Sequence, residues 1–499
     1  MPLFSALATY DRAGYVSFHM PGHKHGSGAP PGAVAALGRS VFSLDKTAVI
    51  GGYLDALHAP AGVLREAQDM LASCFGAARS YFLFNGTAAG AQVLLLALCR
   101  PGDRVVVSAD LDAQTALALI LAGVEPTFCP PARLDGLPAP VSASALLECL
   151  RDLPRCRLAL LRGPSAAGQC ADLAAWAAAT RRSGTLLAVD ERFGAHFRFH
   201  PALPEDALSA GADAALHGHC CLPFPRQTGA LHFGPAVVDG PGAIRQLDRA
   251  YQLCTVTSVS YVMLAAMDAS RAMLADRGRA MWEEAVGRAD RLCRALRRAG
   301  WRVVGGPGEP GWDPCRALAW CGRGSAAARA RLRRAGLLVE QLGDWLSLAV
   351  TPGTPDAACD LAAALLAGGA GESPAGPPAE RAEQASLDRE CVLRREQALS
   401  PRRALYGRLR RLPLADCAGE VCGELVSWPA GAPGVLDDAV LLLPGQVVGG
   451  HHIRLLAKSP RWRRDGLAVV EAPAGGERAP AGGERAPAGA EGAAGRVGR

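Results

Sequence analysis

A short glycine-containing segment, NGTAAG, lies between a β-type run and a helical run at residues 85–90. This order puts Gly86, Thr87 and Ala88 at the start of the expected helix. Free backbone N–H groups and the positive end of the helix dipole attract anions there. An ordinary glycine turn with a threonine cap would have the same sequence. The segment therefore predicts either a phosphate-binding turn or a plain helix start.

A carboxylate ends another apolar run of the chain. Asp190 is the last residue of TLLAVD. A side chain at the carboxyl end of a parallel strand can face the crevice in which α/β proteins bind ligands. The alternative is a turn or helix-cap residue. Asp190 is thus a candidate binding residue, and it does not by itself indicate catalysis.

Histidine and cysteine gather at His217, His219, Cys220 and Cys221. Residues at alternate positions of a strand share one face, and both residue types are good zinc ligands. A structural zinc site needs a second group of ligands, and none is evident in the sequence. We therefore predict no metal site and interpret these residues as buried thiols and partly hydrogen-bonded histidines.

Lysine is almost absent from the chain. Its 499 residues include only Lys24, Lys46 and Lys458, so nearly all of the 53 basic residues are arginine. The guanidinium group stays protonated in proteins and is a poor nucleophile. Chemistry that needs an amine therefore has only three residues to draw on.

The candidate residues lie among alternating β-type and helical runs. From about residue 80 to 235, short apolar runs alternate with alanine- and leucine-rich segments, which is typical of βα units around a largely parallel sheet. The expected strands are 81–85, 104–108, 157–162, 185–190, 214–219 and 228–233. We predict an α/β fold, with a second, smaller α/β unit after a long helical stretch.

The composition excludes several classes of protein. The net charge is only +6 and the arginines are interleaved with acids, which indicates solvated helix faces and no nucleic-acid surface. No apolar run is long enough to span a bilayer, and the first residues do not read as a signal peptide. Sixteen cysteines without framework spacing point to reduced thiols. We expect a cytoplasmic protein with no membrane contact.

Seven sequence blocks, in order, resemble the pyridoxal-phosphate-dependent ornithine/lysine/arginine decarboxylases in their short form without a wing domain. They include FHMPGHK, FLFNGTAAGAQ, PGDRVVV, VDERFGAHF and QTGALHF. Residues 419–433 and 441–448 are similar to the family's small C-terminal domain, so the resemblance covers roughly residues 1–460. It implies an aspartate-aminotransferase-like fold of type I.

The resemblance and the composition together imply a division of the chain. The expected parts are an arm at 1–30, a large α/β domain at 31–260, a small α/β domain at 261–368, a linker at 369–398, a C-terminal domain at 399–465 and a disordered tail at 466–499. Family members form dimers or larger assemblies with active sites between subunits. We expect a homo-oligomer, or a hetero-oligomer with a paralogue.

The resemblance also assigns roles at the cofactor. The loop matching Gly86, Thr87 and Ala88 cradles the phosphate of pyridoxal phosphate, the aspartate matching Asp190 pairs with the pyridine nitrogen, and His219 matches the histidine of a His-Lys pair. The lysine of that pair, which forms the Schiff base, aligns with Cys220. A thiol can add to an aldehyde but cannot form the imine that enables transaldimination.

Four further family positions differ. Asp112 replaces the ring-stacking histidine, Phe193 replaces the second histidine of an Asp-Glu-Ala-His block, Ala166 replaces an aromatic hydroxyl, and His217 replaces a phosphate-contacting serine. The three lysines fall in blocks with other roles or beyond the match.

These changes predict an inactive homologue that binds the cofactor weakly through Gly86, Thr87, Ala88 and Asp190. Two alternatives remain. One is an active decarboxylase of a basic amino acid. The other is a non-catalytic partner of an active paralogue, with which the block TSVSY at 257–261 is compatible.

Overall fold

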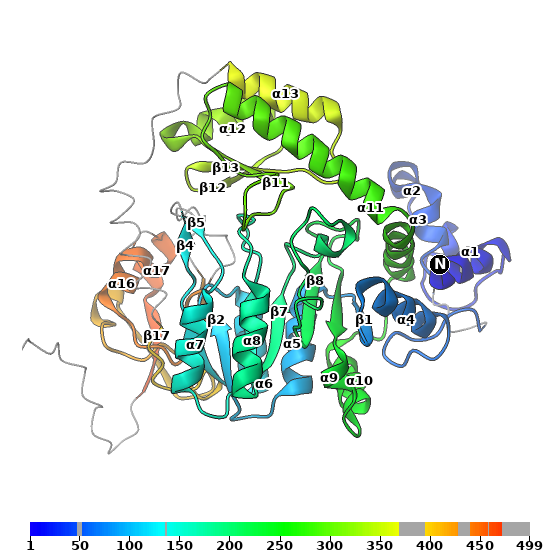
Figure 1. The fold of residues 1–499 in the computed structure, drawn as a ribbon. Coiled ribbons are helices and arrows are strands. Elements are labelled where there is room, and N and C mark those ends of the chain that lie inside the picture. The colour runs from blue at the N-terminus through cyan, green and yellow to red at the C-terminus, as the bar shows by residue number, and fades with distance from the viewer. Residues whose placement is uncertain (47–51, 135–136, 369–394, 428–439, 458, 472–499) are drawn as a thin grey trace, which may run out of the picture.

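A computed structural model describes residues 1–46, 52–134, 137–368, 395–427, 440–457 and 459–471. A seven-stranded sheet forms its centre (Figure 1). The strands lie in the spatial order β1 (Arg79–Leu83), β9 (Gly229–Phe233), β8 (Ala214–Gly218), β7 (Leu186–Asp190), β6 (Leu158–Arg162), β2 (Arg104–Ser108) and β3 (Glu125–Cys129). Only β9 runs against its neighbours β1 and β8, so the sheet is mainly parallel, as predicted.

All six expected strands occur, each within two residues of its predicted bounds. The sequence pattern missed β3, which lies at the edge of the sheet. Pro126 interrupts this segment. An edge strand tolerates proline because one side of its backbone has no strand to pair with.

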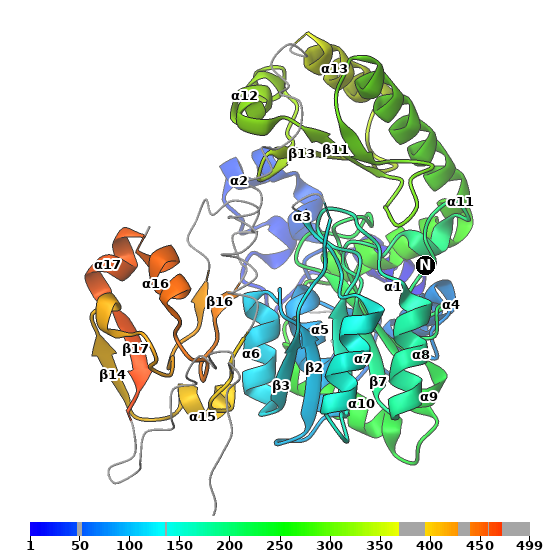
Figure 2. The same cartoon turned by 60° about the vertical axis from the view of Figure 1, so that its left-hand side comes forward.

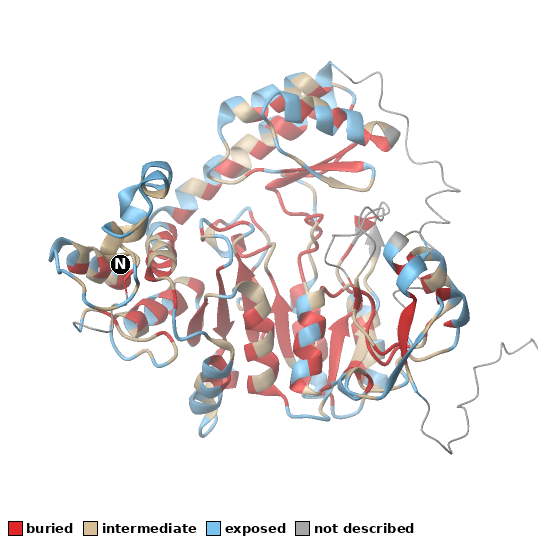
Figure 3. Cartoon of the chain, turned by 180° about the vertical axis from the view of Figure 1, so that it is seen from behind, coloured by how far each residue is buried: buried red, intermediate tan, exposed pale blue. Residues whose placement is uncertain are grey.

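Helices cover both faces of the large sheet (Figure 2). The helices α5 (Gly86–Leu98) and α6 (Ala113–Ala122) pack side by side, and α10 (Ala243–Cys254) packs on α5. The helices α7 (Ala143–Asp152) and α8 (Leu173–Ser183) form the second layer with their own apolar core around Trp176. Buried residues concentrate in the strands and in the inward faces of these helices (Figure 3).

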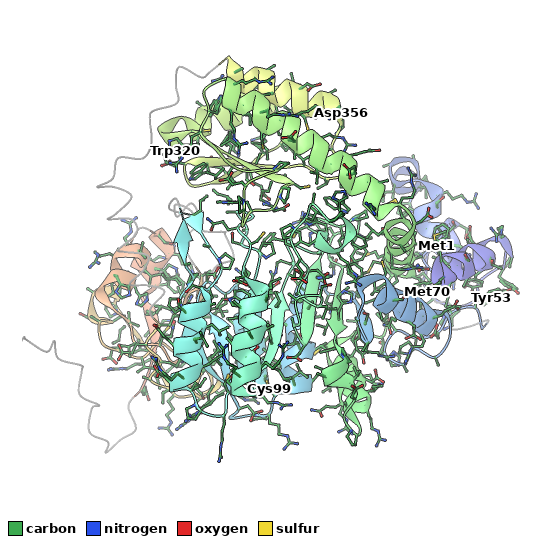
Figure 4. The ribbon with its side chains drawn as sticks, viewed as in Figure 1. Met1, Tyr53, Met70, Cys99, Trp320 and Asp356 are labelled. Atoms are coloured by element: carbon green, nitrogen blue, oxygen red, sulfur yellow. The ribbon has the colours of Figure 1, made fainter. Side chains whose placement is uncertain are left out.

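The 38-residue helix α11 (Tyr261–Arg298) leads from the large sheet to a second sheet. That antiparallel sheet has the order β10 (Val303–Gly305), β11 (Arg316–Trp320), β13 (Trp345–Ala349), β12 (Glu340–Leu342). It is accompanied by α12 (Ser325–Arg334) and α13 (Asp356–Ala367). Trp320 and Asp356 mark this unit in Figure 4, and Cys99 lies at the far end of the large sheet.

The N-terminal segment packs against the helices at one side. The helix α1 (Pro2–Arg12) contacts α11 and α4 (Val63–Phe75). The backbone N–H groups of Leu3 and Phe4 donate to Asp268 on α11, at 3.0 and 3.3 Å. The short helices η1 (Lys24–Gly26), α2 (Pro31–Leu37) and α3 (Arg39–Ser43) follow, and α2 has no buried residue.

A small C-terminal unit lies beside α6 and β3 (Figure 2). It contains α15 (Pro401–Leu405), β14 (Leu409–Leu412), η5 (Leu414–Asp416), β15 (Val426–Ser427), β16 (Val440–Leu442), α16 (Gly450–Leu456), α17 (Pro460–Asp465) and β17 (Leu467–Val470). The predicted tail from 466 therefore starts too early, because Leu467 and Val469 are buried and β17 pairs with β14. The expected linker lies mostly outside the described residues.

The remaining short elements are β4 (Arg133–Leu134), β5 (Leu137–Pro138), η2 (Phe197–Phe199), α9 (Pro235–Val238) and η3 (Gly322–Gly324). Among the helices that the structure describes, none is both long and apolar enough to cross a bilayer.

Candidate functional site

The candidate residues meet at one edge of the large sheet. Arg162 and Asp190 are the last residues of the neighbouring strands β6 and β7 and are paired in register. Gly218 ends β8, and a Cβ atom at this glycine would lie 3.2 Å from Cβ of Arg192 and 3.3 Å from Cγ2 of Thr87. The absence of a side chain at Gly218 thus lets the start of α5 approach the loop after β7.

The helix α5 begins at Gly86, which has a φ of 68° that favours glycine. Thr87 and Ala88 lie in its first turn, and the N-cap residue is Asn85, whose side chain makes no capping bond. The alternative of a threonine cap is therefore wrong. The predicted helix start at Gly86, Thr87 and Ala88 is confirmed.

Asp190 is held by an arginine two residues further on. Nε of Arg192 donates to Oδ1 of Asp190 at 2.8 Å, and Nη2 donates to Oδ2 at 2.6 Å. Its third nitrogen, Nη1, lies 2.7 Å from Oδ2 of Asp112. One planar guanidinium group thus bridges two buried carboxylates, whose side chains are 7% and 5% exposed. Such bidentate pairs are among the strongest polar contacts in proteins.

A second arginine completes the group. Arg162 donates from Nη2 to Asp112 at 3.1 Å and from Nη1 to the carbonyl of Asp110 at 2.9 Å. Its Nε lies 3.6 Å from Asp190. We call Asp110, Asp112, Arg162, Asp190 and Arg192 the arginine–aspartate cluster.

Asp112 lies at the amino end of α6, where it accepts the N–H of Thr115 at 2.8 Å. Burial alone would raise the pKa of Asp112, but Arg192 and Arg162 outweigh it and lower the pKa to about 2. The carboxylate is therefore ionised at neutral pH and serves as a paired helix cap.

A small cavity lies beside these groups. A cavity of about 20 Å³ is lined by Ser108, Leu111, Thr115, Arg162 and Asp190, among others. Pockets for small molecules typically measure about 300–1,000 Å³, whereas a volume near 20 Å³ holds about one water molecule. Asp190 lies at the end of β7, as predicted, but both of its carboxylate oxygens accept hydrogen bonds from Arg192.

Cys220 lies in the turn after β8 and is exposed, with the half-buried His219 before it. Despite this exposure, desolvation by the surrounding protein raises the pKa of the Cys220 thiol to about 11. The charges of Arg192 and Arg316 act in the opposite direction and do not compensate. The thiol is therefore protonated at neutral pH and is a poor nucleophile.

The other residues singled out in the sequence have the following contacts. His217 is buried on β8, with Nε2 2.8 Å from Oε2 of Glu191 and its ring against Phe75 and His232. Its side chain is therefore engaged by Glu191 and by the rings of Phe75 and His232. The Phe193 ring and the Ala166 carbonyl both contact Arg316 of the small sheet, at 5.8 and 2.7 Å.

The two described lysines are engaged by residues of the N-terminal arm. Lys24 donates from Nζ to the carbonyl of His19 at 2.5 Å. Lys46 pairs with Asp11 at 2.9 Å and lies over the ring of Tyr10. Lys458 lies outside the described residues.

Arg192 was not among the predicted site residues. The sequence could have indicated this residue, because the family block reads Asp-Glu-Ala-His and this chain has arginine at the alanine position. A small residue next to a ligand-binding carboxylate leaves room for a ligand, whereas arginine fills that room and supplies a cation.

Comparisons with known proteins agree with the resemblance. A sequence model of the family described as "Orn/Lys/Arg decarboxylase, major domain" matches residues 1–304. An arginine decarboxylase of Bacillus subtilis is 26% identical over 474 residues, covering 92% of this chain and 93% of that protein. A lysine decarboxylase of Pseudomonas aeruginosa, LdcA, is 24% identical over 333 residues, which cover 59% of this chain and 43% of that protein. The crystal structure of the Francisella novicida lysine decarboxylase LdcF superposes with a TM-score of 0.77 at 17% identity, covering 94% of this chain and 80% of that one.

Proposed function

The chain belongs to the Orn/Lys/Arg decarboxylase family and has the fold of type I pyridoxal-phosphate enzymes, and we propose that it is a catalytically inactive member of this family. In this proposal its own Arg192 takes the place of the cofactor ring. The observation that carries the proposal is the bridge from Arg192 to both Asp190 and Asp112. In the family, these two positions contact the pyridine nitrogen and the ring face.

The residues at this site do not fit pyridoxal phosphate. Cys220 stands at the proposed Schiff-base position, and its thiol cannot form an imine. Both oxygens of Asp190 are engaged by Arg192, so a pyridine nitrogen would have to displace an existing bidentate pair. The cavity at Asp190, about 20 Å³, is too small for an aromatic ring. These observations argue against even the weak binding expected from Gly86, Thr87, Ala88 and Asp190.

The physical reason for this arrangement is charge. Two buried carboxylates at the end of a sheet need a cation, because an unpaired buried charge costs several kcal/mol. In an active relative, a protonated pyridine ring would supply the cation for the aspartate that matches Asp190. Arginine supplies a planar group that never loses its proton, so Arg192 can replace that charge permanently.

We expect the purified protein to form no adduct with pyridoxal phosphate and to release no carbon dioxide from arginine, lysine or ornithine. The adduct is measured as an imine absorption band that borohydride can trap. Carbon dioxide release is measured beside the Bacillus subtilis arginine decarboxylase as a positive control. A stoichiometric trapped adduct, or release above background, would overturn the proposal and favour an active decarboxylase.

The N-terminal arm supports a role in assembly. Val16, Phe18 and Met20 are 85%, 98% and 68% exposed, and Met1 is 48% exposed. Figure 4 shows Met1, Tyr53 and Met70 on one side of the molecule. Large apolar side chains exposed at residues 16, 18 and 20 of one segment are typical of a protein interface. We propose that the arm joins two copies of this chain, with an active paralogue as the alternative partner.

Replacing Phe18 with glutamate is expected to convert an oligomer of the wild-type chain to monomer, or to weaken the assembly at least tenfold. A charge buried in an apolar contact is unfavourable. The measurement is molar mass by light scattering over a dilution series. Leu338→Glu, at another exposed position, is the matched control and should leave the mass unchanged. A monomeric wild-type chain would contradict a homo-oligomer.

The free cysteines are consistent with a protein that acts in a reducing compartment. All fifteen cysteines that the structure describes are free, and none of them forms a disulfide. Reduced cysteines are typical of cytosolic proteins. We propose that the protein acts in the cytoplasm.

A further inference from the structure

The C-terminal unit is more basic than the rest of the chain. Its described ranges, 395–427, 440–457 and 459–471, contain ten arginines and six acidic residues. These short ranges thus hold an excess of four positive charges, whereas the whole chain has a net charge of only +6. Nine of the ten arginines are exposed, namely Arg402, Arg403, Arg408, Arg410, Arg411, Arg454, Arg461, Arg463 and Arg464. The unit therefore presents a basic surface to solvent.

One strand of this unit, β14, has a free edge in the part of the chain that the structure describes. On one side it pairs with β17 (Figure 2), and the backbone at 421–423 continues the pairing beyond β17. No described strand pairs with the other side of β14. Alternate backbone N–H and C=O groups of such a strand point outward and can pair with another chain.

Arginine side chains stand on both faces of this strand. Successive residues of a strand point to opposite faces, so Arg410 lies on one face and Arg411 on the other. Arg410 pairs with Glu420 at 3.1 Å, and Arg411 lies 3.7 Å from Glu424. The two arginine side chains are 45% and 56% exposed, so each guanidinium group keeps N–H donors that face solvent. Both faces can therefore bind a further carboxylate.

The residues before β14 add an unpaired cation and apolar surface. Arg408 is exposed and pairs with no acidic side chain among the described residues. Its carbonyl accepts the N–H of Glu471 at 2.9 Å, so the pairing on the β17 side already begins at Arg408. Tyr406 and Leu409 are 76% and 40% exposed. We call residues 406–412 the β14 edge.

We propose that the β14 edge binds an acidic, extended segment of a partner protein as an added strand. In this mode of recognition, main-chain hydrogen bonds give affinity and the side chains at alternate positions give specificity. Glutamates or aspartates on one face of the added strand meet Arg408 and Arg410, and those on the other face meet Arg411. Apolar residues of the segment cover Tyr406 and Leu409. This binding function needs no cofactor.

The charge of the β14 edge selects against a second copy of this chain. A second β14 would bring its own arginines to the same edge, and like charges opposite each other in a sheet are destabilising. Exposed charges on edge strands commonly prevent self-association for this reason. An acidic strand turns the same repulsion into attraction, so the arginines exclude basic partners and favour acidic ones.

A single-stranded nucleic acid also carries negative charge, but it matches the β14 edge less well. Proteins that bind single strands combine a basic groove with several aromatic side chains on which bases stack. Tyr406 is the one aromatic residue in the sequence of the β14 edge. The outward backbone groups of β14 are suited to a peptide main chain. These observations favour a peptide.

The test uses the full chain and a fluorescein-labelled peptide of alternating glutamate and valine. We expect binding by fluorescence anisotropy that weakens as salt is added, because exposed charges are screened. Hydrogen exchange should slow at residues 409–412 when the peptide is bound. A peptide with proline in place of valine keeps the charge but cannot pair as a strand, and it should bind at least tenfold more weakly.

Reversing two charges on the edge provides the matching variant. Arg408→Glu/Arg411→Glu should bind the acidic peptide at least tenfold more weakly and should gain binding to a peptide of alternating lysine and valine. Arg329→Glu/Arg333→Glu, at two exposed positions of α12, changes the net charge equally and is the matched control. It should bind the acidic peptide like the wild type. Circular dichroism checks that both variants fold.

Four results would overturn the proposal. They are a wild-type chain that does not bind the acidic peptide, slowed exchange outside the β14 edge only, and a folded Arg408→Glu/Arg411→Glu variant that binds as tightly as the α12 control. The fourth is tighter binding of oligothymidine than of the acidic peptide, which would assign this surface to nucleic acid. None of these measurements involves pyridoxal phosphate, so this proposal and the proposed function can fail separately.

Discussion

The double variant Cys220→Lys/Arg192→Ala is expected to form an imine with pyridoxal phosphate, whereas Cys220→Lys alone is expected to bind it at least tenfold more weakly. Lysine supplies the missing amine. Alanine restores the family residue at position 192, frees both oxygens of Asp190 and opens the space that the guanidinium group fills. Arg162 still pairs with Asp112 at 3.1 Å, so the buried carboxylates keep one cation.

The measurement is the imine absorption band, borohydride trapping and the mass of the trapped peptide. Arg192→Ala without the lysine is the matched control, and it should form no trapped adduct. If Cys220→Lys alone bound the cofactor as tightly as the double variant, Arg192 would not be the obstacle. If the label appeared on Lys24 or Lys46, the assignment of position 220 would be wrong.

Replacing Arg162 with leucine is expected to lower the free energy of unfolding by about 3–5 kcal/mol, because it leaves buried carboxylates with too few cations. Burial is the largest influence on Arg162 and would lower its pKa, but Asp110 and Asp112 outweigh burial and raise it. The loss is measured as a shift in the denaturation midpoint at neutral pH. Arg151→Leu, at an ion pair whose side chains are 74% and 77% exposed, is the control and should change the unfolding free energy by less than about 0.5 kcal/mol.

The stability difference between the wild type and Arg162→Leu should also depend on pH. The pKa of Asp112 is lowered from 3.8 to about 2 in the folded protein. Its contribution to stability is therefore complete above pH 3.8 and is lost as the pH falls through about 2. The difference in unfolding free energy between the wild type and Arg162→Leu should therefore shrink as the pH falls from 3.8 to about 2. An advantage that stays constant from neutral pH to pH 2 would show that packing of the Arg162 side chain, and not the ion pair with Asp112, is responsible.

The fold could largely be predicted from the sequence, because each strand of the large sheet except β3 is a short apolar run between turn residues. Pro126 obscured β3, and the alanine- and glycine-rich C-terminal composition obscured β17. The strand LAVV at β17 is buried only because β14 provides its partner.

The candidate site was predictable only in part. Asp190 and the start of α5 follow from local patterns and were placed correctly. Arg192 and Asp112 are 80 residues apart in the sequence, and their ion pair depends on the fold. The periodicity of apolar residues indicates local helices and strands and cannot predict such a contact.

The helix α11 has a mechanical consequence. At 1.5 Å per residue its 38 residues form a rod about 57 Å long. Asp268, near one end, holds the first turn of α1, while the other end packs on the small sheet. Sharp kinks in long helices usually occur at proline, and α11 contains no proline. If another subunit binds the N-terminal arm and moves it, α11 would pass that movement to the small sheet. The loop that carries Asp313 and Cys315 would then move with the small sheet.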